Sequence, residues 1–104
     1  MKIKSGVRIL GICPEVLLAA SIAESVYLKY SAEATITAGI DSKHSRASMH
    51  YAGRAIDLRI NNVKQDQWSH LRQDLADSLG ADFDVLLESD HIHVEYEPKE
   101  PYTA

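Results

Sequence analysis

Apolar residues recur at helical spacing in two stretches of the chain. The first stretch predicts a helix over residues 14–29, because Pro14 suits the first position of a helix. The second helix is predicted to begin near Asn62, which precedes Gln65 by three residues as in a capping box, and to end at Gly80. The residues at helical spacing on the two expected buried faces are Leu17, Ala20, Ala23 or Glu24, Tyr27 and Tyr30, and then Trp68, Leu71, Leu75 and Leu79.

Strands are predicted where β-branched residues cluster or where apolar and polar residues alternate. The alternation over residues 55–60 would turn Ile56 and Leu58 toward the core and Asp57 toward the opposite side. Ser89–Asp90 would form the tight turn of a hairpin near the end of the chain. The predicted strands cover residues 35–37, 55–60, 83–87 and 92–96.

The order of these elements predicts the fold class. Helix, strand, loop, strand, helix and two strands indicate an α+β domain, in which two main helices pack on a small, mostly antiparallel sheet. Residues 1–12 are expected to form a short strand or a docked arm, and the polar residues 40–54 to form a loop. A length of 104 residues fits one domain, residues 1–104, whose tail over residues 97–104 is expected to fray.

Composition and charge narrow the classes of function. Lys and Arg number 11 against 15 Asp and Glu, and the scattered cations form no basic stripe, so we expect no nucleic-acid partner. The longest apolar run, residues 16–23, falls well short of the roughly 20 residues that span a bilayer, so we expect no membrane segment. Cys13 is the single cysteine, so the chain cannot form an internal disulfide. Because the chain has five histidines, any metal site is expected to use histidine ligands.

The N-terminus has two interpretations. Lys2, Lys4 and Arg8 precede the apolar run, and Ser21–Ala23 mimics a cleavage site, as in a secretory signal peptide. Pro14–Glu15 interrupts the apolar region, which favours a first helix of the mature domain instead. We therefore expect that the chain has no signal peptide and is made in the cytoplasm. We also expect the protein to be a monomer.

Four histidines lie in two clusters that also hold carboxylates. His44 and His50 precede Asp57 in the first cluster, and Glu88 precedes His91 and His93 in the second. Residues two apart on a strand face the same side, so His91 and His93 project together, and Asp57 projects from another strand. Two imidazoles and one carboxylate would give Zn²⁺ three ligands and leave a fourth position for water. A pair of solvated histidines without metal is the alternative.

Two segments of the chain resemble known families. The segment Ser48-Met-His50-Tyr-Ala-Gly53-Arg-Ala-Ile-Asp57 is similar to the first motif of the M15 zinc D-Ala-D-Ala peptidases, and Glu88-Ser-Asp-His-Ile-His93 is similar to their second motif. Both segments also resemble the amino-terminal signalling domain of Hedgehog proteins, which shares the DD-peptidase fold. The Hedgehog likeness extends to Ile36–Asp41 and His44–Ser45.

The resemblance implies roles for individual residues. It makes His50, Asp57 and His93 the ligands of Zn²⁺ and leaves His91 beside the metal. His44 matches a histidine near the zinc of Hedgehog domains, and Glu88 matches the acidic base of the peptidases. Ser48 would position the ligand loop from outside the coordination sphere.

Three departures from the peptidase and Hedgehog patterns leave alternatives. Asp90 stands three residues before His93, where some M15 enzymes carry their acid, so it competes with Glu88 for the base. The arginine that binds substrate in many M15 enzymes is missing from its usual place, and Arg46 or Lys43 would have to replace it. The acidic calcium cluster of Hedgehog domains is also incomplete, so no calcium site of that kind is expected.

These observations favour one function over two others. The leading hypothesis is a zinc metallopeptidase that hydrolyses D-Ala-containing stem peptides of peptidoglycan, as a phage, prophage or bacterial cell-wall enzyme. Glu88 would act as the base, while His91, and alternatively His44, would stabilise the oxyanion. The second hypothesis is a Hedgehog-like binding module that holds zinc without turnover, and the third is a metal-free structural protein. The bond that is cut stays open, between a carboxypeptidase and an endopeptidase.

Overall fold

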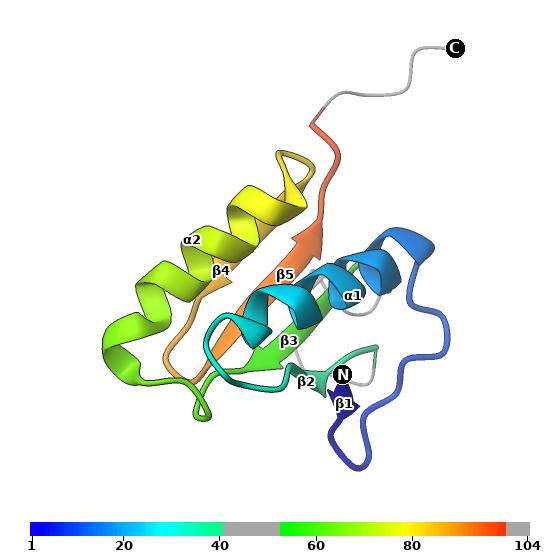
Figure 1. Ribbon diagram of the computed structural model, residues 1–104. Coiled ribbons are helices and arrows are strands. Elements are labelled where there is room, and N and C mark those ends of the chain that lie inside the picture. Colours follow the sequence, from blue (N-terminus) through cyan, green and yellow to red (C-terminus); the bar gives the residue numbers. More distant parts are fainter. Residues whose placement is uncertain (41–52, 100–104) are drawn as a thin grey trace.

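Two helices lie on one face of a five-stranded sheet (Figure 1). The computed structural model describes residues 1–40 and 53–99 of the chain. Within these ranges no helix combines the length and apolar character that crossing a membrane requires. The elements are β1 (Lys2–Ile3), α1 (Pro14–Leu28), β2 (Thr35–Ala38), β3 (Ala55–Arg59), a 3₁₀ turn (Gln65–Gln67), α2 (Trp68–Leu79), β4 (Phe83–Leu87) and β5 (His91–Tyr96).

The sheet has the strand order β1-β2-β3-β5-β4. Only the edge pair β1–β2 is parallel, and the other neighbours pair antiparallel, with β4 and β5 forming a hairpin. The predicted α+β class and the mostly antiparallel sheet with two main helices are therefore confirmed. β3 and β5 lie at the centre, where Asp57 is directly opposite His93 and Arg59 is directly opposite His91.

The two faces of the central strands differ in chemistry. Ile56 and Leu58 of β3, with Ile92 and Val94 of β5, are buried in the core under the helices. The alternate positions of the same strands carry the polar side chains on the opposite face. The Tyr27 hydroxyl of α1 donates a hydrogen bond of 2.7 Å to the carbonyl of Arg59, which fixes the end of β3 to the helix layer.

The helices differ from their predicted forms in two respects. Leu17 was expected in the core but is 47% exposed, and Val16 is buried in its place. Apolar residues occupy five consecutive positions there, residues 16–20, so spacing alone does not select the buried side. α2 begins at Trp68, because the Asn62 side chain donates to the Glu33 carbonyl (2.9 Å) instead of capping a helix.

Residues 7–12 form an N-terminal arm that packs beside Ile40 and Gly53. These two residues flank the segment 41–52, which lies outside the described residues. Ile40 N donates to the Arg8 carbonyl (3.0 Å), and Cys13 N donates to the Gly53 carbonyl (2.8 Å). Gly53 has φ +71°, and a Cβ there would lie 2.1 Å from the Gly11 carbonyl oxygen. A glycine is therefore required at residue 53 both by its backbone conformation and by the close approach of the arm.

Candidate metal centre

Asp57 and His93 form the centre of the polar sheet face. Their strands pair so that the two residues are direct neighbours, and His93 Nδ1 lies 3.0 Å from Asp57 Oδ1. The Asp57 side chain is only 6% exposed and the His93 side chain 12%. His93 Nε2 lies 3.0 Å from Glu95 Oε1, so carboxylates flank both nitrogens of the ring.

These carboxylates determine the charge of the imidazole. The hydrogen bond to Asp57, and the weaker effect of Glu95, raise the pKa of His93 to about 9, although burial opposes the charged form. At neutral pH both ring N–H groups therefore donate to carboxylates. The proton on His93 supplies the positive charge that the buried Asp57 carboxylate needs.

The donor atoms fit a zinc ion in place of that proton. Imidazole nitrogen and carboxylate oxygen are both ordinary ligands of Zn²⁺. Two such atoms on a tetrahedral zinc, at bond lengths of about 2.0–2.1 Å, are roughly 3.3 Å apart, close to the 3.0 Å between His93 Nδ1 and Asp57 Oδ1. Glu95 would then hold the second ring nitrogen, as carboxylates do for metal-bound histidines. Glu95 was not singled out from the sequence, although it stands two residues after His93 on the same strand.

His91 lies on the same face, next to this pair. Its Nε2 is 3.6 Å from Asp57 Oδ2, and its Nδ1 is 2.7 Å from Asp90 Oδ1. Asp90 is 85% exposed, in the turn that precedes β5. The Asp90 carboxylate therefore orients the His91 ring through Nδ1, while Nε2 faces Asp57.

Glu88 occupies a different position from Asp90. It is exposed in the hairpin turn, and its backbone N donates to the His91 carbonyl (2.9 Å). Asp90 and His91 line a pocket of about 360 Å³ beside Asp57, and Glu88 is not among the lining residues. The residues lining it are Lys4, Thr37, Ala38, Asp57, Arg59, Asn61, Asp90 and His91. The role of Glu88 as the base stays a prediction.

The remaining predicted site residues come from the first cluster. His44, Arg46, Ser48 and His50 lie outside the described residues, as does Lys43. The third zinc ligand, His50, and the roles of the other three therefore stay predictions.

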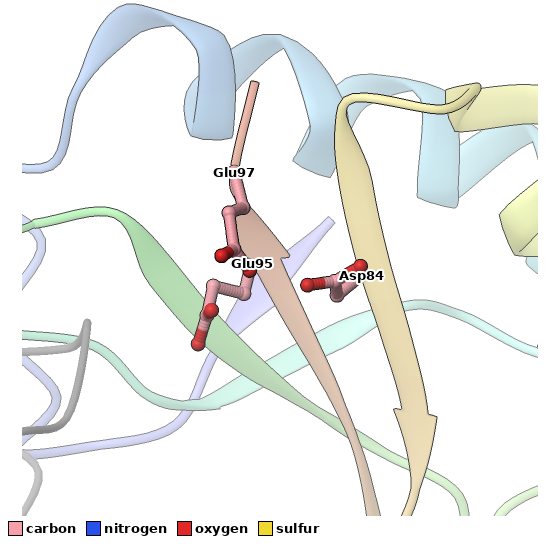
Figure 2. A group of neighbouring side chains, drawn as sticks. All are labelled: Asp84, Glu95 and Glu97. Carbon is pink, nitrogen blue, oxygen red and sulfur yellow. The ribbon is translucent and has the colours of Figure 1, made fainter. Parts of the chain in front are cut away.

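A second group of possible ligand oxygens lies at the other end of the β4–β5 hairpin (Figure 2). Carboxylate oxygens of Asp84, Glu95 and Glu97 lie within 4.8 Å of one another. Lys99 Nζ lies 3.0 Å from Asp84 and 3.8 Å from Glu97. A hydrogen bond to Glu97 and the contacts with Lys99 lower the pKa of Asp84, whereas the hydrogen bond to Asp84 raises that of Glu97. The sequence did not show this group, because it depends on the hairpin register that places Asp84 opposite Glu95.

The comparison with known families decides where this chain belongs. The Hedgehog amino-terminal signalling domain matches residues 16–95. The chain belongs to the Hedgehog signalling-domain family. The match covers β2 to β4 and all but the ends of α1 and β5, and so includes Asp57, His91 and His93. It places the chain in the Hedgehog/DD-peptidase superfamily, as the resemblance implied. No curated protein matches the chain.

The Hedgehog match agrees with the observed architecture. A small α+β domain with two helices on a mixed sheet is consistent with a Hedgehog-like fold. The superfamily is associated with zinc, and in this chain the strand pairing brings two of the three predicted ligands together. The match to a signalling domain suggests a binding function, whereas the resemblance to peptidases suggests an enzyme.

Proposed function

We propose that the chain is a zinc-dependent peptidase that hydrolyses D-Ala-containing stem peptides of peptidoglycan. One observation carries this proposal: Asp57 and His93 are buried opposite each other, 3.0 Å apart, beside a pocket of about 360 Å³. His50 completes the ligand set in this proposal. A zinc site next to an open pocket suits a reacting ligand, whereas a structural zinc is normally closed by four protein ligands.

The chain's own residues divide the chemistry between them. When bound, zinc would lower the pKa of a water molecule and polarise the substrate carbonyl. Asp90 holds the Nδ1 side of His91, and Nε2 faces Asp57. When both ring nitrogens carry a proton, the Nε2–H can donate to the developing oxyanion. A carboxylate takes the proton of the attacking water and returns it to the leaving amine. Glu88 is the residue that the resemblance implies for this role, and Asp90 is the carboxylate that lines the pocket.

Hydrolysis with zinc-loaded protein tests the proposal. We expect N-acetyl-Lys-D-Ala-D-Ala or purified cell walls to be cleaved, with the activity removed by a chelator and restored by zinc. His93→Ala should be inactive, whereas His70→Ala, which changes an exposed histidine on α2, should be as active as the unchanged chain. Stoichiometric zinc binding without any cleavage would contradict the peptidase proposal.

A second candidate function is a zinc-containing binding module without turnover. The match to a signalling domain favours it, and so does the position of Glu88 outside the pocket lining. The same assay separates the two candidates, because only the peptidase releases a free amine from the peptide. In such a module zinc would only stabilise the fold, so its removal would lower the melting temperature without affecting any reaction.

A further inference from the structure

Two cations line the pocket next to the Asp57–His93 pair. Arg59 follows Asp57 by two residues on β3, so both side chains lie on the polar face, and its direct neighbour on β5 is His91. Lys4 reaches the same pocket from the N-terminal segment, where its backbone N donates to the Ile36 carbonyl (2.9 Å). Sequence spacing could have indicated Arg59, but Lys4 is distant in sequence and only the fold brings it here.

The acidic side chains of the pocket contact histidines and not the two cations. Asp57 faces His93 and His91, and Asp90 faces His91 at 2.7 Å, so both anions contact imidazole groups. Neither Lys4 nor Arg59 forms an ion pair with another residue in the described parts of the chain. Two cations of this kind beside a reaction site match an anionic group on the ligand.

We propose that Lys4 and Arg59 form a carboxylate-binding subsite, so that the ligand is a peptide with a free C-terminal carboxylate. A guanidinium can bind a carboxylate through two parallel hydrogen bonds, and an ammonium adds a compact charge. The Arg59 backbone is fixed by the bond from Tyr27 and by its pairing with His91, which positions the side chain. Asn61 and Thr37 line the same pocket and offer neutral hydrogen-bonding groups.

The assignment of the chain as a carboxypeptidase rests on the proposed function, because it requires that the chain is a peptidase. A carboxylate held beside the metal centre directs cleavage to the last peptide bond, so the chain would be a carboxypeptidase. An endopeptidase cleaves an internal bond, next to which there is no terminal carboxylate for the two cations to bind. The same subsite would still select C-terminal carboxylates in a protein that binds peptides without cleaving them.

Binding is measured first, with the full chain freed of metal by a chelator. N-acetyl-Lys-D-Ala-D-Ala should bind at least about 10-fold more tightly than its C-terminal amide, since charge-assisted hydrogen bonds contribute roughly 10- to 100-fold each. Arg59→Gln and Lys4→Gln should each reduce that preference, and Arg59→Lys should retain part of it. Lys2→Gln is the matched control, because Lys2 lies near Glu33 and does not line the pocket. Lys4 is exposed, so its variant should fold even if Arg59→Gln does not.

Kinetics with the zinc-loaded chain then separate the two proposals. Equal binding of acid and amide in the unchanged chain would overturn the subsite, and so would equal kcat/KM for the two peptides. Cleavage of both peptides at similar rates would overturn the subsite and leave the peptidase proposal standing. A carboxylate preference that depends on Arg59 and Lys4, in a chain that cleaves neither peptide, would support the subsite and contradict the peptidase proposal.

Discussion

The backbone of Gly53 meets the carbonyl oxygen of Gly11 so closely that a Cβ on Gly53 would lie 2.1 Å from that oxygen. The contact joins the N-terminal arm to the residue that precedes Arg54 and β3, four positions before Asp57. The glycine in the first motif therefore has a structural explanation, because both its positive φ and the arm exclude a side chain.

The first prediction concerns this contact. Gly53→Ala should destabilise the fold by about 3–5 kcal/mol, from the strain of a left-handed conformation and the displacement of the arm. Gly6→Ala is the matched control, since Gly6 has φ +88° and open space around its Cα, and should cost only about 1–2 kcal/mol. Urea denaturation of the two variants measures the difference. Equal destabilisation would show that the arm does not constrain residue 53.

The second prediction concerns the zinc ligands. His50→Ala, Asp57→Ala and His93→Ala should each lose zinc and much of the thermal stability that zinc provides, because metal binding is coupled to folding. His91→Ala should keep zinc, since that ring lies beside the Asp57–His93 pair and is oriented by Asp90. Metal analysis and thermal melts of the purified variants provide the test. Loss of zinc from His91→Ala with retention in His93→Ala would reverse the assignment.

The third prediction concerns Glu95, which contacts His93 Nε2 at 3.0 Å. Glu95→Gln should keep the fold but weaken zinc binding by about 10- to 100-fold, the usual effect of removing a carboxylate that orients a metal-bound histidine. Glu97→Gln removes a carboxylate two residues further along and should leave zinc affinity nearly unchanged. Competition with a chromogenic chelator measures both affinities, and an unaffected Glu95→Gln would contradict this role.

The fourth prediction decides between two carboxylates. Glu88→Gln should retain zinc and lose activity by about 10²–10⁴-fold if Glu88 is the base. Asp90→Asn should then have a smaller effect, through a less ordered His91 ring. The contact between Asp90 and His91 (2.7 Å) makes the opposite result informative. Near-normal turnover in Glu88→Gln, together with an inactive Asp90→Asn, would transfer the base to Asp90.

The fifth prediction concerns the pH dependence of the zinc-free protein. The folded pKa of His93, about 9, lies above the ordinary value of 6.5, so the protonated ring stabilises the folded state. That stabilisation should be complete below about pH 6.5 and should disappear as the pH rises through about 9. Zinc affinity should change in the opposite direction, because the metal displaces this proton. Melting temperatures at pH 6 and pH 10, with and without a chelator, test both signs. Asp57→Asn should flatten the zinc-free profile.

The sequence predicted the strands better than it predicted the helices. Alternation of side chains fixes which face of β3 and β5 is buried, and it correctly turned Asp57 and His93 to one face. In α1 the consecutive apolar residues fit several orientations, so Leu17 was expected in the core where Val16 lies, whereas Ala20, Ala23 and Tyr27 are buried as predicted. The capping box at Asn62 failed because a carbonyl 29 residues earlier in the chain binds that side chain.

The candidate site was predictable where its residues share a strand or a motif. Asp57, His91 and His93 follow from strand periodicity and from the two motifs. The cationic side of the pocket was missed because Lys4 reaches it only through the pairing of β1 with β2. The approach of Gly11 to Gly53 likewise depends on how the arm packs, which no local pattern encodes.

The position of β4 at the edge of the sheet has a consequence for association between molecules. An edge strand presents open backbone groups with which another chain can pair, and β4 also exposes Leu86 and Leu87. Asp84 places a charge within this strand, Lys99 lies against it at 3.0 Å, and Arg72 from α2 reaches the Val85 carbonyl at 3.5 Å. Charged groups therefore protect the open edge, and neutralising Asp84 together with Lys99 would favour strand-to-strand aggregation without changing the interior of the fold.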